Sequence, residues 1–261
     1  MSPESHVNGR PDVLHEPGTP EGHDVPDGPS PGDCPSPETA PTSCTTLLVI
    51  AKEPVPGRAK TRLTPPFSPD EAAELAEASL ADTLDTVRSL PARRRVLVLA
   101  GAPGPWLPDG FEAVPQSGGG LDERIAAAFS LCEGPALLVG MDTPQITPEL
   151  LAPALEAGGW EGCDAWFGPA ADGGFWALGL AEPRPELVRG VPMSLESTGT
   201  LQRRRLVEAG LMVRDLPVLR DVDTAEDAAE VAEHLADRVR SGGTASRFAA
   251  VHERVAGVVR R

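Results

Sequence analysis

The chain has 261 residues, and its 23 lysines and arginines against 39 aspartates and glutamates give it a formal net charge of −16. Such an acidic chain argues against nucleic-acid binding, which needs a cationic face to neutralise phosphates. The longest aliphatic run, 47–51, is far shorter than the roughly 20 residues of a membrane helix, and the start of the chain lacks the pattern of an export signal. Its four cysteines show no C-x-x-C spacing. Together these features predict a cytoplasmic protein with no membrane or nucleic-acid partner.

The first part of the chain has a different composition from the rest. Residues 1–43 hold ten prolines, five glycines and eight acidic residues against a single arginine. A segment this poor in aliphatic side chains cannot bury enough apolar surface to offset the entropy lost on ordering. We therefore expect a disordered tail over 1–44, a folded domain over 45–240, and an appended helix over 241–261.

From residue 45 onward, buried strands alternate with amphipathic helices. The aliphatic run 46–51 is typical of a strand that is buried on both faces of a parallel sheet. Ser68 and Glu71 form a capping-box pattern that predicts the start of a helix. Further expected elements are strands at 96–100 and 136–141, a helix over 121–132 and another helix from 147 onward.

The second half of the domain predicts an antiparallel pair. Strands at 163–168 and 174–180 flank a Gly-rich turn, as in a hairpin. A helix over 198–209, a strand at 212–219, a helix over 224–239 and a last helix after 244 complete the expected order. Alternation of this kind predicts a three-layer α/β/α sandwich with a mostly parallel sheet and an antiparallel insertion. In such sheets ligands bind beyond the carboxyl ends of the strands.

A cationic loop follows the first strand. Residues 52–62 carry four basic side chains and one acid. They match neither the phosphate-loop pattern of ATPases nor the dinucleotide fingerprint. Two interpretations remain open: an exposed basic loop, or an anion cradle suited to a diphosphate or triphosphate. The candidate nucleotide-binding residues here are Lys52, Gly57, Arg58, Lys60 and Arg62.

Two acids stand where a metal ion could be held. Asp142 comes at the carboxyl end of a buried strand, and Mg²⁺ usually takes one or two carboxylates from a protein. The best candidate for a second ligand is Asp223, just before a helix. The alternative for Asp223 is an ordinary role beside a helix cap, because Thr224 and Asp227 also form a capping pattern.

Two loops complete the set of candidates. Asp172, Gly173 and Gly174 form a hairpin tip, which is either a tight turn or a loop that meets a second substrate. Gln116 and Gly119 lie in a similar loop before a helix, which is either a flexible turn or part of the nucleotide site.

Four motifs in this order resemble those of the DUF2064 family. They are Ala51-Lys52-x-Pro54-x-Pro56-Gly57-x-x-Lys60-Thr61-Arg62-Leu63, Gly140-x-Asp142-x-Pro144, Gly168-Pro169-Ala170-x-Asp172-Gly173-Gly174-Phe175 and Asp221-Val222-Asp223-Thr224. This family comprises the radical-SAM/selenodomain-associated transferases, within the glycosyltransferase-A-like nucleotide-diphospho-sugar transferase superfamily. The chain is also similar, more distantly, to 2-phospho-lactate guanylyltransferases. The resemblance covers about 45–237, and the stretch 193–198 departs from the family pattern.

The resemblance implies a glycosyltransferase-A fold that binds a nucleoside triphosphate or a nucleotide-diphospho-sugar with Mg²⁺ or Mn²⁺. It places Gly57, Lys60 and Arg62 in the phosphate loop, and Asp142 and Asp223 at the metal. The acceptor loop is then the one that contains Asp172, Gly173 and Gly174.

Three functions remain open at this point. The first is nucleotidyl transfer from a nucleoside triphosphate to a small phosphorylated acceptor with release of pyrophosphate, helped by Lys60 and Arg62. The second is glycosyl transfer, with Asp172 as the base. The third is nucleotide binding without turnover. A homodimer is an open expectation, because the last helix packs either on the body or on a partner.

Overall fold

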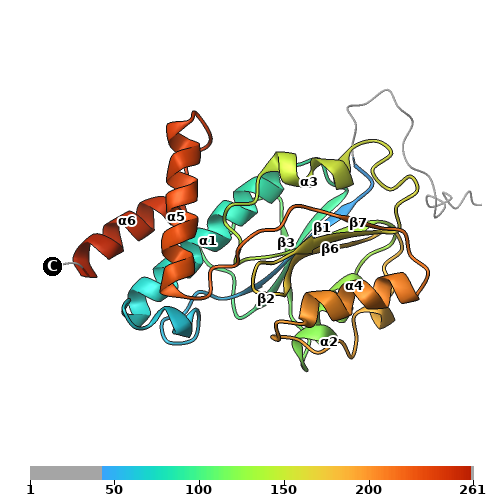
Figure 1. The fold of residues 1–261 in the computed structure, drawn as a ribbon, viewed down its shortest axis with the longest axis horizontal. Coiled ribbons are helices and arrows are strands. Elements are labelled where there is room, and N and C mark those ends of the chain that lie inside the picture. Colours follow the sequence, from blue (N-terminus) through green and yellow to red (C-terminus); the bar gives the residue numbers. More distant parts are fainter. Residues whose placement is uncertain (1–42, 260–261) are drawn as a thin grey trace, which may run out of the picture. The chain divides into compact units, whose positions relative to one another are not determined.

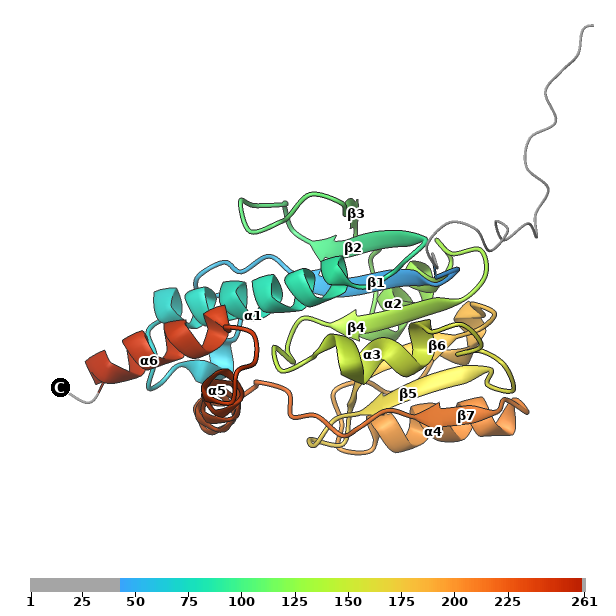
Figure 2. The ribbon, with the colours of Figure 1, turned by 90° about the horizontal axis from the view of Figure 1, so that it is seen from above.

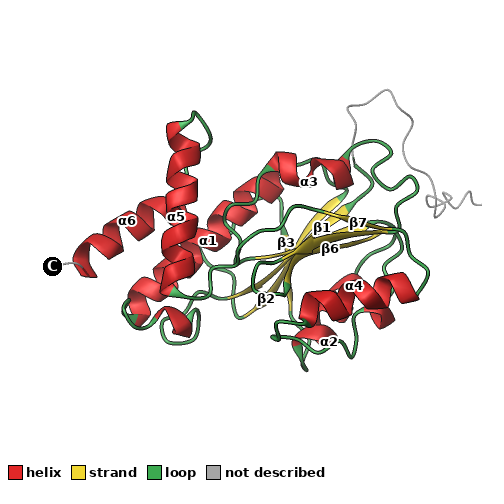
Figure 3. Cartoon of the chain, viewed as in Figure 1, coloured by secondary structure: helices red, strands yellow, loops and turns green. Residues whose placement is uncertain are grey.

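The computed structural model describes residues 43–259. The predicted disordered tail, 1–44, lies outside the described residues except for its last two positions. Strands and helices alternate along the chain (Figures 1 and 3). The strands are β1 (Thr46–Lys52), β2 (Arg94–Ala100), β3 (Glu112–Pro115), β4 (Ala136–Gly140), β5 (Ala165–Pro169), β6 (Phe175–Leu180) and β7 (Val213–Asp215). The α-helices are α1 (Pro69–Ser89), α2 (Leu121–Phe129), α3 (Pro148–Leu155), α4 (Thr198–Glu208), α5 (Ala225–Arg240) and α6 (Arg247–Val259).

The strands form one seven-stranded sheet in the order β3-β2-β1-β4-β6-β5-β7. Strand β6 runs against its two neighbours, β4 and β5, and the other pairings are parallel. The hairpin predicted at 163–180 therefore joins the sheet through its second strand, which inserts between β4 and β5. This confirms the predicted mostly parallel sheet with an antiparallel insertion.

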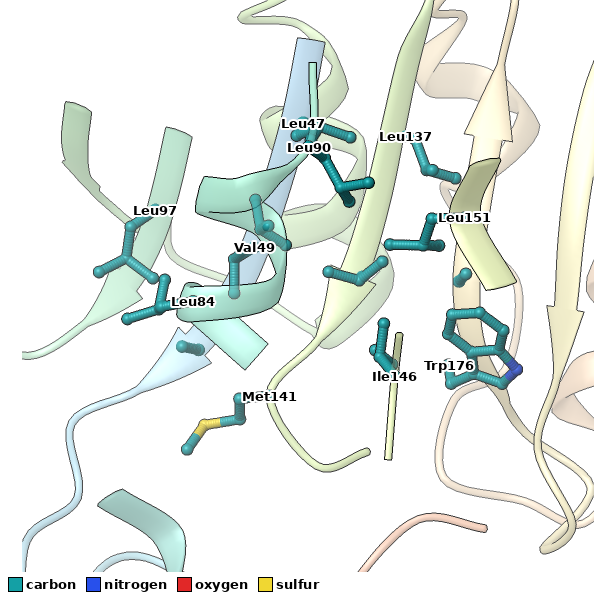
Figure 4. Close-up of a cluster of buried hydrophobic side chains, with 14 of the residues drawn as sticks. Leu47, Val49, Leu84, Leu90, Leu97, Leu137, Met141, Ile146, Leu151 and Trp176 are labelled. Atoms are coloured by element: carbon teal, nitrogen blue, oxygen red, sulfur yellow. The ribbon is translucent and has the colours of Figure 1, made fainter. Parts of the chain in front are cut away.

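Helices cover both faces of the sheet. On one face, α1 and α3 pack on the inward side chains of β1, β2 and β4 in an apolar cluster that includes Leu84 and Leu151 (Figure 4). On the other face, α2 and α4 pack through Ile125, Phe129 and Leu206. Both faces of the central strands are thus buried, and the predicted three-layer sandwich is confirmed.

Two helices lie away from the sheet: α6 packs against α1, and α5 packs against α6 (Figure 2). A third apolar cluster joins them to α1 and to the short 3-10 helix Thr61–Leu63 that follows the cationic loop. Its members are Leu63, Phe67, Ala72, Leu75, Ala78, Val222, Ala228, Val231, Ala232, Leu235, Phe248 and Val255. We call this set the α1–α5–α6 cluster. The helix expected after residue 244 is therefore α6, and it packs on the body of its own chain.

Two strands differ from the sequence-based prediction. The edge strand β3 was not predicted, because its four residues are mostly exposed and carry no aliphatic run. The strand predicted over 212–219 is observed only as Val213–Asp215. Pro217 has no backbone N–H to donate to a ladder, and beyond β7 the contacts with β5 continue as single hydrogen bonds from Leu216 and Leu219. None of the helices over 43–259 combines the length and apolar character of a membrane span.

Candidate functional site

The site lies at the carboxyl ends of two neighbouring parallel strands. β1 and β4 pair in register, with Ile50 opposite Gly140, so the residues that follow them emerge at the same edge of the sheet. Lys52 ends β1, and Asp142 comes two residues after the end of β4. This is the edge at which open α/β sheets bind ligands.

Hydrogen bonds hold the end of β4 in place. The Ser79 hydroxyl of α1 donates to the Met141 carbonyl at 2.6 Å. The Lys52 N–H contacts the Met141 sulfur at 3.1 Å, which ties the two strand ends together. Met141 is buried, so the backbone beside Asp142 is fixed before any ligand binds.

A distant segment brings the second predicted acid to the same place. The Val222 N–H donates to the Asp142 carbonyl at 2.9 Å, and the Gln145 side-chain amide donates to the Arg220 carbonyl at 2.6 Å. Asp223 follows directly, before the capping box in which Thr224 caps α5. The cap and the acid are therefore adjacent features, and the cap does not use the Asp223 side chain.

Lys60 lies between the two acids. Its Nζ is 2.8 Å from Oδ1 of Asp142 and 3.2 Å from Oδ1 of Asp223, and the side chain is only 9% exposed. Its backbone is left-handed, with φ 48° and ψ 41°, an uncommon conformation for lysine. Arg62 reaches Oδ2 of Asp223 at 3.4 Å from the solvent side. The cationic loop and both acids thus meet in one cluster.

The charges of this cluster shift two pKa values. Burial alone would lower the pKa of Lys60, but the charges and hydrogen bonds of Asp142 and Asp223 outweigh it and raise that pKa. The ammonium is therefore charged at neutral pH. Burial, followed by the nearby charges of Asp142 and Asp172, raises the pKa of Asp221 to about 7.

Six of the predicted site residues line a single pocket of about 280 Å³. They are Lys52, Arg58, Lys60, Arg62, Asp142 and Asp223. The remaining lining residues are Ala59, Thr61, Ala76 and Met141. Lys60 and Asp223 are more than 160 residues apart in the sequence, so only the fold brings them together.

Three residues predicted to bind nucleotide lie outside this pocket. Gly57 belongs to the same loop and has φ +71°, which suits glycine at a turn. The Gln116 side-chain amide donates to the Ala51 and Val98 carbonyls at 2.7 and 3.1 Å, and so ties the ends of β1 and β2. Gly119 accepts a hydrogen bond from Arg124 at its carbonyl, at the start of α2. A nucleotide role for these three stays a prediction.

The predicted acceptor loop also lies outside the pocket, as the turn between β5 and β6. Oδ1 of Asp172 accepts the Gly174 N–H at 2.8 Å, as in an Asx turn. The Gly173 carbonyl accepts the Gly199 N–H at 2.8 Å, which packs the turn on the start of α4. A Cβ at Gly173 would meet the Glu196 carbonyl oxygen at 2.0 Å. The turn therefore needs glycine at position 173, and its acceptor role stays a prediction.

Asp221 lies near the site, although its sequence pattern predicted no role for it. One of its carboxylate oxygens is buried and has no hydrogen-bond partner in the described structure. The only sequence signal was its place two residues before Asp223 in a D-x-D pattern. Its electrostatic coupling to Asp142, Asp172 and Asp223 shows that acids from three segments approach this edge of the sheet.

The residues present fit a hard divalent ion through two carboxylates. Within residues 43–259 no three His, Cys, Asp or Glu side chains converge as a metal-binding group. Mg²⁺ commonly uses one or two protein carboxylates and completes its shell with water and phosphate oxygens. The Lys60 ammonium contacts Oδ1 of both Asp142 and Asp223, so this pair of oxygens already accommodates one shared cation.

Comparisons with known proteins agree with this fold. The DUF2064 family model, described as an uncharacterized protein conserved in bacteria, matches residues 76–195. The resemblance to this family is confirmed over that range, which is shorter than the predicted 45–237 and excludes the cationic loop and Asp223. No protein of curated function matches the chain in sequence.

One solved structure extends the similarity over most of the chain. The proposed nucleotide-diphospho-sugar transferase of Desulfovibrio desulfuricans G20 is 25% identical with a TM-score of 0.71, over 83% of this chain and 96% of that one. Rv0371c of Mycobacterium tuberculosis H37Rv, solved as a manganese complex, is 22% identical with a TM-score of 0.43, over 73% and 99% of the two chains. The 2-C-methyl-D-erythritol 4-phosphate cytidylyltransferase of Thermus thermophilus is 18% identical with a TM-score of 0.44, over 75% and 99%.

Proposed function

We propose that this chain, which matches the DUF2064 family model over residues 76–195, is a metal-dependent nucleotidyltransferase. Its donor is a nucleoside triphosphate, its acceptor is a small phosphorylated molecule, and its leaving group is pyrophosphate. The observation that carries this proposal is the meeting of Lys60, Asp142 and Asp223 in one pocket that is also lined by basic side chains.

The balance of charges favours a triphosphate over a diphosphate. Lys52, Arg58, Lys60 and Arg62 line the pocket from one loop, and Lys and Arg bind phosphate oxygens through charge-assisted hydrogen bonds. In the reaction an acceptor oxygen bonds to the α-phosphorus while the bond from that phosphorus to the bridging oxygen breaks. Lys60 and Arg62 neutralise the negative charge that develops on the departing pyrophosphate.

Asp142 and Asp223 would hold the metal ion. When bound, Mg²⁺ or Mn²⁺ would supply positive charge to the phosphate oxygens. The two carboxylates come from segments joined by the Val222–Asp142 hydrogen bond, so their spacing is set by the protein. Lys60 must then turn from the carboxylates toward the phosphates, which keeps its positive charge in the pocket.

The acceptor proposed here needs no strong base. Of the five histidines in the chain, those in the described part, His234 and His252, lie on α5 and α6 and do not line the pocket. A phosphate acceptor is already ionised at neutral pH, so a site without histidine suits it. Asp172, at the β5–β6 turn, is the residue that we propose to contact the acceptor.

A second candidate is glycosyl transfer from a nucleotide-diphospho-sugar. The observation that favours it is the similarity to the Desulfovibrio protein proposed as a nucleotide-diphospho-sugar transferase. In that case Asp142 would face the metal on the diphosphate, and Asp172 would act as the base for an acceptor hydroxyl.

A binding screen separates the candidates. Thermal stabilisation is measured with nucleoside triphosphates and with nucleotide-diphospho-sugars, each with Mg²⁺, with Mn²⁺ and with EDTA. Nucleotidyl transfer predicts metal-dependent stabilisation by a triphosphate, and pyrophosphate release when small phosphorylated acids are added. Stabilisation by a nucleotide-diphospho-sugar but by no triphosphate contradicts it and favours glycosyl transfer. A lack of stabilisation by any nucleotide would refute both.

A further inference from the structure

The two segments that form the site are both anchored in one apolar cluster. Leu63, which directly follows Arg62, is 0% exposed, and Val222, which directly precedes Asp223, is 1% exposed. Both belong to the α1–α5–α6 cluster. The positions of the cationic loop and of Asp223 therefore depend on how that cluster is packed.

One wall of this cluster is α6. Its Phe248 and Val255 are 0% and 1% exposed, and the His252 ring meets that of Phe67 edge-on at 5.9 Å between centroids. Phe67 follows the same loop and lies just before the start of α1. Figure 2 shows α6 beside both α1 and α5, on the side away from the sheet.

Asp82 of α1 binds the start of α6, where Arg247 also pairs with Asp85 of the same helix. The carboxylate of Asp82 accepts the Ser246 hydroxyl at 2.7 Å and the N–H groups of Arg247 and Phe248, each at 3.0 Å. Its side chain is only 10% exposed. These contacts satisfy N–H groups that have no partner within a helix, and they fix Phe248 in the cluster.

We propose that α6 is a positioning element for the site, with Phe248 as its central residue. By filling the cluster, Phe248 holds Leu63 and Val222, and through them it sets how Arg62 and Asp223 face each other. The expected effect on nucleotide binding rests on the proposed function. The expected effect on the rigidity of the cationic loop and of the segment that ends at Asp223 does not.

The test uses the full chain and a matched control. Phe248→Ala removes a 0% exposed ring from this cluster, and Phe129→Ala removes an equally buried ring from the other face of the sheet. Phe248→Leu retains most of the apolar volume. Circular dichroism at the working temperature confirms that each variant is folded. A variant that does not fold is replaced by Asp82→Asn, which loosens α6 at its attachment.

Amide hydrogen exchange is the first measurement. We expect Phe248→Ala to accelerate exchange at Leu63 and Val222, whose N–H groups bond to the Lys60 and Asp142 carbonyls at 2.9 Å. Phe129→Ala should leave both amides unchanged, and Phe248→Leu should restore their protection. Unchanged exchange in Phe248→Ala overturns the proposal, and so does equal acceleration by Phe129→Ala.

The second measurement is the dissociation constant of a non-hydrolysable nucleoside triphosphate with Mn²⁺. We expect about a tenfold weakening in Phe248→Ala, with wild-type affinity in Phe129→Ala and Phe248→Leu. Faster exchange with unchanged affinity overturns the positioning role. If the wild type binds no triphosphate, the proposed function fails, and the exchange result alone decides whether α6 orders the two segments.

Discussion

Replacing Lys60 by methionine removes the ammonium that lies between Asp142 and Asp223 and keeps an apolar chain of similar length. Removing one partner of a buried ion pair typically costs about 3–5 kcal/mol. Both carboxylates are 38% exposed, so water screens part of the repulsion that remains and we expect about 2 kcal/mol. For a domain of this size that lowers the Tm by roughly 4–8 °C in EDTA.

A divalent ion should reverse this loss, because it supplies positive charge at the same two oxygens. Titration of Mn²⁺ without nucleotide, followed by thermal melting, should raise the Tm of Lys60→Met more than that of the wild type. Lys52→Met is the control. Lys52 also lines the pocket but forms no ion pair with the described residues, so its replacement should change the Tm in EDTA little. Equal Mn²⁺ responses of the wild type and Lys60→Met would refute the shared cation position.

Other substitutions test the remaining parts of the site. Asp142→Asn should abolish the Mn²⁺-dependent rise in Tm with a triphosphate, and a retained rise would contradict its role as a ligand. Arg62→Ala should weaken triphosphate binding about tenfold and monophosphate binding little, because a charge-assisted hydrogen bond contributes about 1.5–3 kcal/mol and the 73% exposure of the Arg62 side chain favours the lower value; equal losses in isothermal titration would count against a phosphate contact. Asp221 has a folded-state pKa of about 7 against an ordinary value of 3.8, so the folded state holds a proton that the unfolded chain has released. The contribution of Asp221 to the stability of the metal-free protein should therefore fall as the pH rises from about 4 through 7. In denaturant titrations at several pH values, the unfolding free energy of the wild type should decline relative to that of Asp221→Asn over this range; an unchanged difference between the two would refute the assignment.

Much of the fold was predictable because its signals are local. The aliphatic run of β1 and the capping box formed by Ser68 and Glu71 appear in the structure where the sequence placed them. β3 could not be predicted, because this short, exposed edge strand has neither an aliphatic run nor a regular alternation of apolar and polar residues. Pro217 ended β7 early, which a propensity for β structure alone does not reveal.

The site was predictable in its composition but not in its contacts. Strand ends with charged residues pointed to Lys60 and Asp142, and the parallel pairing of β1 and β4 explains why they meet. That Lys60 would bridge both acids depends on its left-handed backbone and on the segment 220–223, which no local pattern encodes. The role of Gln116 as a tie between strand ends was equally invisible, since it depends on the carbonyls of two other strands.

Crystals grown with Mn²⁺ and a non-hydrolysable nucleoside triphosphate would test the central claim most directly, through anomalous scattering at the manganese edge. The account predicts one anomalous peak between the carboxylates of Asp142 and Asp223, with Lys60 Nζ moved from these oxygens to the phosphates. A peak elsewhere, or Lys60 still bridging the two acids beside a bound triphosphate, would contradict it.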